Sequence, residues 1–315
     1  MHECLSFGDS ITYERINDGI DLFEMKDEHG EGRMRMVSIL NGVCLQFNDF
    51  HMKKCESKLN VDARVFCIDH CREGRIEHQL RNGIYSYLSP GDLRIDDRSY
   101  HYTTFDMPLA HYHGITIAFF IEEAEQSIRE AFPGFPVDLS KLHEKYCRNK
   151  DPFVIRNEAH IEHIFSELYK VPACIKEYYY KIKIFELLLF LDALELSDHQ
   201  QSAPYFYKTQ VEKIKSIQKL ITDNVENHYT LEELSDQFDI PLTSMKNCFK
   251  GVYGTTIYSY IRSCRMNRAA VLLKTTDFSV ARIAGDVGYN SPSKFAAAFR
   301  QVMMSSPLDY RKSLV

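Results

Sequence analysis

Residues 231–262 and 280–311 repeat one pattern at an offset of 49 to 50 positions. In each copy an amphipathic segment with helical spacing is followed by a break, at Asp239-Ile240-Pro241 or at Gly288-Tyr289-Asn290, and then by a second amphipathic segment. Each copy therefore predicts a helix, a tight turn and a second helix. Two such units in succession restrict the C-terminal part of the chain to an all-α fold.

The second helix of each predicted unit is apolar on one face only. Its other face offers small, hydrogen-bonding and cationic side chains, which are the groups that base edges and phosphates require. The candidate DNA-contacting residues are Thr243, Ser244, Lys246, Asn247, Lys250, Ser291, Ser293, Lys294 and Arg300. A helical pattern from Ile257 to Leu273 joins the units as a rod of about 26 Å, which would hold both of them on one face of a duplex.

The region from about Val211 to Lys312 resembles the DNA-binding domain of AraC/XylS-type transcription regulators. The resemblance rests on Arg265 to Leu273 (RMNRAAVLL), Ile283 to Tyr289 (IAGDVGY), Phe295 with Phe299, and Ser306 to Arg311 (SPLDYR). It implies that this region binds double-stranded promoter DNA, that RNA polymerase is a further partner and that the chain is an activator. It also implies an upstream cupin-like effector barrel followed by dimerising helices.

Two positions depart from the family pattern. Met304 stands where the family usually has a glycine that ends the second recognition helix in a left-handed conformation. Ala297 stands where family members often have arginine, and Ala296-Ala297-Ala298 offers no side-chain donor. We therefore expect the second unit to grip phosphates through Lys294 and Arg300, and the first unit to read most of the bases.

Charge is distributed unevenly between the two halves. The whole chain has 38 Lys and Arg against 44 Asp and Glu, a net charge of −6. Residues 205–315 contain 15 basic and 10 acidic residues, a net charge of +5, whereas residues 1–204 carry −11. A basic helical region favours nucleic-acid binding over the alternative of an interaction bundle that has no role with DNA.

The N-terminal half is predicted to be mostly β. From about 33 to 121, short β-rich runs alternate with turn signals such as Asn82-Gly83 and Pro90-Gly91-Asp92. The overall fold class is therefore α+β. Residues 1–198 form an effector-binding and dimerisation domain with a cupin-like barrel and helices over 122–198. Residues 199–209 are a linker, and 210–315 form the DNA-binding domain.

The helical segment from Tyr180 to Leu196 carries an apolar stripe that is wider than one packing face needs. It is either a core helix or a dimer helix. The second interpretation predicts a homodimer in which Ile184, Leu188 and Leu191 meet a second subunit.

An effector site is expected inside the barrel, where polar and aromatic residues on strands could hold a small molecule. The candidates are Arg64, His78, Tyr85, Tyr87, His111 and His113. His111-x-His113 also looks like the start of a cupin metal site, but that site needs a glutamate four or five residues later, where Ile117 and Ala118 stand. No metal ligand and no cofactor are therefore predicted.

Other functional classes have little support. Phosphate-binding loops, dinucleotide-binding turns and the Gly-x-Ser-x-Gly elbow are absent, so no catalytic residue is assigned and the chain is predicted not to be an enzyme. A metal-dependent cupin-type enzyme fused to a DNA-binding module is the alternative, and an N-terminal half that only dimerises is a third. The start has no signal sequence and no apolar run is long enough for a membrane, so a cytoplasmic protein without membrane contact is expected.

Overall fold

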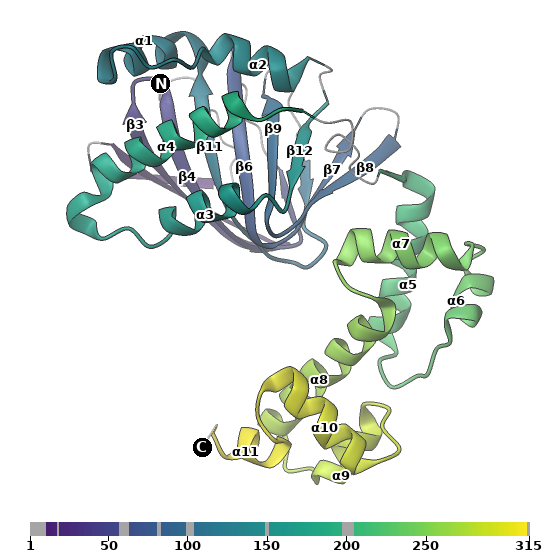
Figure 1. The fold of residues 1–315 in the computed structure, drawn as a ribbon. Coiled ribbons are helices and arrows are strands. Elements are labelled where there is room, and N and C mark those ends of the chain that lie inside the picture. The colour runs from purple at the N-terminus through teal and green to yellow at the C-terminus, as the bar shows by residue number, and fades with distance from the viewer. Residues whose placement is uncertain are drawn as a thin grey trace. The chain divides into compact units, whose positions relative to one another are not determined.

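The computed structural model describes residues 11–17, 19–56, 63–80, 83–98, 104–148, 151–196 and 205–313. The chain divides into two compact units, Met1–Tyr205 and Phe206–Val315. The first contains β-sheets and helices, and the second is almost entirely helical (Figure 1). The predicted α+β class is confirmed. Among the residues just given, no helix has the length and apolar character that crossing a membrane requires.

The larger sheet of the first unit is antiparallel and runs in the order β1-β2-β3-β4-β11-β6-β9-β12. Its strands are β1 (Ile11–Asn17), β2 (Ile20–Asp27), β3 (Gly30–Leu40), β4 (Val43–Met52), β11 (Tyr112–Phe120), β6 (Val65–Gly74), β9 (Asp92–Asp97) and β12 (Phe153–Arg156). The sheet begins at Ile11, upstream of the predicted start near residue 33, because β1 and β2 form an additional hairpin.

A smaller sheet in this unit runs in the order β8-β7-β10-β5. Its strands are β8 (Ile84–Leu88), β7 (Ile76–Leu80), β10 (Thr104–Asp106) and β5 (Lys54–Glu56). The predicted turn at Asn82-Gly83 lies between β7 and β8, although Asn82 is outside the described residues. The strands of the described chain are thus arranged as two sheets.

The two faces of the larger sheet bury different cores. On one face Leu45, Ile115 and Ile117 pack with the helices α1 (Ile121–Ala131), α2 (Leu139–Cys147), α3 (Ala159–Leu168) and α4 (Lys176–Ala193). Figure 1 shows α3 and α4 crossing this face. On the other face Phe50 and Tyr112 pack with Leu88 of the smaller sheet. Since side chains alternate along a strand, odd-numbered residues of β4 and β11 point to the helix side.

The helix α4 corrects the dimer prediction. Ile184, Leu188 and Leu191 are at most 2% exposed and belong to the helix-side core of their own chain. The sheet and neighbouring helices already cover these side chains, so they do not face a second subunit as predicted. The exposed apolar residues of this region are Ile175, Tyr178, Ile182 and Leu189, which are 44–69% exposed.

The second unit contains the two predicted helix-turn-helix motifs. Its elements are β13 (Phe206–Tyr207), α5 (Lys208–Asp223), α6 (Leu231–Gln237), α7 (Leu242–Tyr253), α8 (Ile257–Thr275), α9 (Val280–Asp286), α10 (Pro292–Met303) and α11 (Pro307–Lys312). The first motif is α6–α7 and the second is α9–α10. Most of the predicted linker, residues 199–209, lies outside the described residues.

The long helix α8 belongs to both motifs of this unit. Its 19 residues make a rod of about 28 Å. Ile257 near its start is buried, while Met266 and Leu273 further along pack with Phe295 and Phe299 of α10. One continuous helix therefore connects the two motifs.

Candidate nucleic-acid interface

The first helix-turn-helix is fixed by local hydrogen bonds. Thr230 Oγ1 accepts a hydrogen bond from the Glu233 backbone N–H at 3.1 Å, and the Glu233 carboxylate accepts one from the Thr230 N–H at 2.8 Å. This capping box starts α6. After α6 the backbone turns through Asp239, which is left-handed with φ 46°, and Ser235 Oγ donates to the Ile240 carbonyl at 2.7 Å. The turn and the start of α7 are thereby held in place.

The second motif uses the same backbone plan with other residues. Gly288, at φ 81°, is its left-handed turn residue and stands 49 positions after Asp239. Ser291 caps α10, because its Oγ accepts a hydrogen bond from the Lys294 N–H at 3.4 Å, and Pro292 follows as the first helical residue. Ser291, predicted to contact DNA, therefore also serves as the cap of the recognition helix.

The buried residues of α7 and α10 place the two recognition helices in register. Met245 and Phe249 are fully buried in α7, and Phe295 and Phe299, each 50 positions later, are fully buried in α10. By this register Asn247 corresponds to Ala297, and Lys250 corresponds to Arg300. The two helices thus have matching inner faces and different outer faces.

On α7 the predicted contacts form one face. Thr243, Lys246, Asn247 and Lys250 are exposed and lie at positions i, i+3, i+4 and i+7, while Ser244 is half-buried. Three of the five side chains can donate hydrogen bonds through an amide or ammonium group. This face is suited to hydrogen bonding with base edges as well as phosphates.

On α10 the outer face is sparser. Ser293, Lys294 and Arg300 are exposed, and the exposed methyl group of Ala297 lies between them at the position that corresponds to Asn247. Sequence analysis missed Gln301, which is also exposed, lies at i+4 from Ala297 and accepts a hydrogen bond from Arg262 of α8 at 3.2 Å. Its spacing of four residues from Ala297 was the signal in the sequence that places it on this face.

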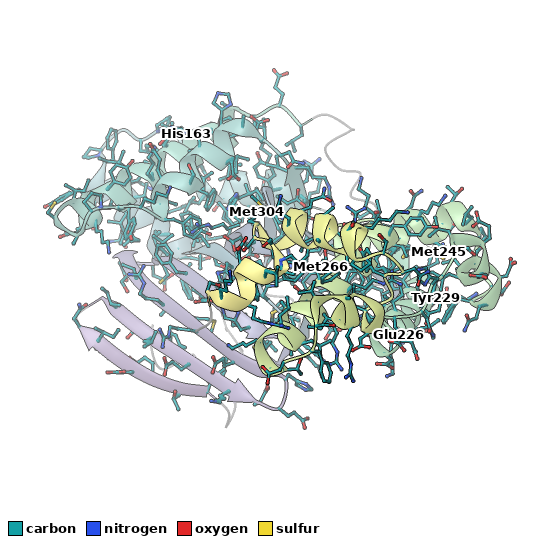
Figure 2. All side chains as sticks on the ribbon, turned by 90° about the horizontal axis from the view of Figure 1, so that it is seen from below. His163, Glu226, Tyr229, Met245, Met266 and Met304 are labelled. Atoms are coloured by element: carbon teal, nitrogen blue, oxygen red, sulfur yellow. The ribbon has the colours of Figure 1, made fainter. Side chains whose placement is uncertain are left out.

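Both recognition helices end in a left-handed residue. Gly254 follows α7 with φ 74°, and Met304 follows α10 with φ 56° and ψ 16°. Figure 2 shows Met304 at the C-terminal end of α10, where its side chain is 87% exposed. Methionine thus adopts a conformation that glycine takes up most easily, and it does so without burying its side chain.

The six predicted effector residues do not come together. His78 points between the two sheets, where it contacts Arg94, and burial followed by the charges of Arg94 and Arg98 keeps the pKa of His78 well below its ordinary value. The Tyr87 hydroxyl donates a hydrogen bond to the Glu77 carboxylate at 2.6 Å, and both side chains lie on the face of the smaller sheet opposite to that of His78.

The other predicted effector residues lie elsewhere. Tyr85 shares its face of β8 with Tyr87. Arg64 is exposed, with Nη1 3.6 Å from the Glu122 carboxylate. His113 points to the helix side of the larger sheet, and the His111 ring lies 6.2 Å from it. His113 therefore points away from the space between the sheets in which His78 lies.

Sequence analysis missed the charged groups that do lie between the sheets. Arg94 and Arg98 both contact the Asp96 carboxylate, and Arg98 also contacts Asp69. Thr116 Oγ1 donates to Asp69 at 2.6 Å. In the sequence these charged residues look like those of a solvent-exposed strand. Only the pairing of β6, β9 and β11 shows that they are enclosed.

Comparison with known proteins gives matches to the second unit. A helix-turn-helix domain family matches residues 234–313, which contain both motifs. The transcriptional activator RhaR of Mannheimia succiniciproducens is 27% identical over 127 residues, 40% of this chain and 46% of that protein. RhaS of the same organism is 27% identical over 155 residues, 49% of this chain and 56% of that protein. The second unit therefore contains a helix-turn-helix domain that is similar to the matching parts of these transcriptional activators.

The chain spans about half the length of these curated relatives. Among solved structures, the second unit is similar to the C-terminal domain of AraT, a response regulator from Geobacillus stearothermophilus, with 25% identity, a TM-score of 0.31 and coverage of 32% of this chain and 84% of that one. A ToxT variant from Vibrio cholerae in its apo form matches 87% of this chain and 98% of that one, with 13% identity and a TM-score of 0.34.

Proposed function

We propose that this protein is a sequence-specific transcription regulator that binds double-stranded promoter DNA through its AraC-type domain. The observation that carries the proposal is the pair of recognition helices, α7 and α10, with exposed cations at equivalent positions, Lys250 and Arg300. Both helices pack on one rod, α8, to which α10 is joined by a shared core and α7 by the contact of Phe249 with Tyr260, and residues 205–315 have a net charge of +5. Such a surface suits the phosphates of a duplex.

The two motifs divide the work of recognition. The α7 surface offers Lys246 and Asn247, whereas the corresponding positions of α10 are Ala296 and Ala297. An amide side chain can bond a base edge in two places, and a methyl group can make only an apolar contact. The first motif therefore reads most of the sequence, while the second adds affinity through phosphates.

Selection of bound duplexes from a random pool, with the full chain, tests this function. We expect an enriched sequence with one well-defined half-site for α7 and a second, weakly defined one for α10. Affinity for the enriched duplex should fall steeply with salt. A pool that shows no enrichment after repeated selection would contradict sequence-specific binding.

We also propose that the chain forms a homodimer. The interface is the exposed side of α4 and not its buried side. Ile175, Tyr178, Ile182 and Leu189 follow one another at steps of three, four and seven residues, which is the spacing of a coiled-coil seam. A second copy of the same seam would bury these side chains symmetrically.

The first unit senses a small molecule, and the protein activates transcription in the cytoplasm by contact with RNA polymerase. Of the predicted effector residues, His78 is the one whose position between the sheets supports a ligand contact. Screening the full chain by thermal shift against anionic and hydroxylated metabolites tests this part. A hit whose shift survives His78→Ala would place the contact elsewhere.

A further inference from the structure

Two histidines and one aspartate converge on the helix side of the larger sheet. Asp49 and His51 lie two residues apart on β4, and His113 lies on β11 directly across from Asp49. His51 Nε2 is 3.0 Å and His113 Nε2 is 3.4 Å from Asp49 Oδ1. The two imidazole rings meet edge to face with centroids 5.0 Å apart. The pairing of β4 with β11 therefore brings the three side chains together, and none of them lies on a loop.

The cluster is open to solvent. It lies beyond Phe47, which is the last β4 residue on this face that packs against helix-side aromatic rings, those of Tyr169 and Tyr180. Asp49 and His51 are exposed and His113 is half-buried. An ion can consequently reach all three side chains without any change of fold.

The distances fit a transition-metal ion. Zinc binds histidine nitrogen and carboxylate oxygen at about 2.0–2.2 Å, so two of its ligand atoms are about 3.0 Å apart at a right angle and about 3.4 Å apart at the tetrahedral angle. The two Asp49 contacts have these lengths. One atom from each of the three side chains lies within 4.8 Å of the other two. Small rotations of the imidazoles would complete the coordination.

The charged residues around the three ligands are paired with one another. Glu31 faces His51 across β3, and Glu73 faces His113 across β6. The nearest facing cation, Arg33, lies across from Asp49 but binds the Glu24 carboxylate at 2.6 Å. Lys26 Nζ lies 3.7 Å from the Glu31 carboxylate and Arg72 Nε lies 3.5 Å from the Glu73 carboxylate, so these surrounding charges balance one another. The carboxylate of Asp49 therefore supplies the negative charge of the site.

We propose that Asp49, His51 and His113 bind a divalent first-row transition-metal ion of the zinc class, through Asp49 Oδ1 and the two Nε2 atoms. Two histidines and one carboxylate leave the remaining coordination positions to water or to an exogenous ligand. The site lies on the helix side of the larger sheet, so it is separate from the space between the sheets where His78 lies. It stands independently of the transcription function.

Local spacing in the sequence does not reveal this site, because no further ligand follows His113 along β11. The structure supplies the other two ligands from β4, more than sixty positions earlier in the chain. His111, the sequence neighbour, is not one of the three: its Nδ1 lies 3.1 Å from the Leu109 carbonyl oxygen, and its ring is 6.2 Å from that of His113.

Titration of the metal-free full chain with Zn²⁺, in competition with a chromophoric chelator, tests the proposal. We expect one ion per chain, and we expect Asp49→Asn and His113→Asn each to weaken binding at least tenfold. His163→Asn is the matched control, since His163 is an exposed histidine on α3 (Figure 2) whose carboxylate neighbour, Glu167, is 3.8 Å away. This control should bind zinc like the unmodified chain.

Two further measurements keep the test decisive. Circular dichroism of each variant shows whether its fold is intact, and Co²⁺ absorption reports on coordination by nitrogen without relying on affinity. Binding that is substoichiometric, or that is the same in the Asp49, His113 and His163 variants, would show that the three side chains form only surface ion pairs and would overturn the proposal.

Discussion

Arg265 of α8 donates a hydrogen bond to the carbonyl oxygen of Gly288, the left-handed residue of the second helix-turn-helix, at 3.3 Å. The same guanidinium donates to the carbonyl oxygens of Val225 and Asn227, both at 2.9 Å. Only 8% of Arg265 is exposed. One side chain of the connecting helix therefore ties the segment after α5 to the turn between α9 and α10.

Replacing Arg265 by methionine should lower the free energy of unfolding of the second unit by about 3 kcal/mol, because several carbonyl oxygens lose a charged donor at once. Denaturant unfolding of the full chain, followed by circular dichroism, measures the change. Arg268→Met on the same helix is the control, since Arg268 is exposed, and it should shift stability by less than about 0.5 kcal/mol. Similar losses in both variants would show that Arg265 has no special role.

Asn247→Ala should weaken binding to the selected duplex by about 1–3 kcal/mol and leave binding to random DNA nearly unchanged, since an amide pair to a base edge carries sequence information. Fluorescence anisotropy on both duplexes gives the two affinities. Gln237→Ala, at the exposed end of α6, controls for loss of an amide elsewhere in the motif. An equal loss on both duplexes would assign Asn247 to the phosphates.

Neutralising Lys250 or Arg300 with glutamine should weaken binding to all duplexes and reduce the slope of log affinity against log salt by about one, because each cation displaces one counterion. The salt dependence of binding measures this slope. Lys219→Gln removes the same charge from α5, where Lys219 pairs with Asp223 at 2.6 Å, and should leave the slope as it is. If Lys250→Gln behaves like Lys219→Gln, Lys250 lies off the interface.

Met304→Gly should stabilise the second unit by about 1 kcal/mol, since a left-handed conformation costs a residue with a Cβ about 1–2 kcal/mol and the exposed Met304 side chain contributes little packing. Gly254→Ala is the reciprocal change at the end of α7 and should destabilise the unit by a similar amount. Thermal unfolding of both variants provides the comparison. A loss of stability in Met304→Gly would mean that the methionine side chain makes a stabilising contact.

Leu189→Glu should yield folded monomers, because it places a charge on the exposed side of α4 where the second copy is expected to bind. Sedimentation gives the oligomeric state. Leu188→Glu, one position away, should instead unfold the first unit, since Leu188 is fully buried in the helix-side core. An intact dimer in Leu189→Glu would exclude this surface from the interface.

Periodicity predicted the helical part of the fold well. Met245, Phe249, Phe295 and Phe299 repeat at helical spacing, and each is fully buried as the repeat requires. The outer residues of α7 and α10 follow from the same pattern, because a helix has one geometry and its faces can be read from spacing alone. The left-handed turn at Gly288 was likewise signalled by its residue type.

The β part was less accessible to sequence analysis. The alternation of residues along a strand shows its two faces but does not show which strand it pairs with. The local sequence therefore cannot place Asp49 beside His113, or Arg94 and Asp96 between the sheets. The apolar stripe on α4 did not distinguish a core helix from a dimer helix, for a related reason. Both sides of that helix are apolar, and only the position of the sheet shows that Leu188 is inside while Leu189 is outside.

The single helix α8 also constrains how the binding sites of this protein can evolve. Its rod of about 28 Å fixes the distance and the rotation between α7 and α10, whereas each base pair inserted between two half-sites turns one of them by about a tenth of a helical turn. A flexible connector could follow such a change, but a continuous helix cannot. Under the proposed function, target promoters could therefore drift by substitution within the weakly read half-site, while insertions and deletions between the half-sites would abolish simultaneous contact.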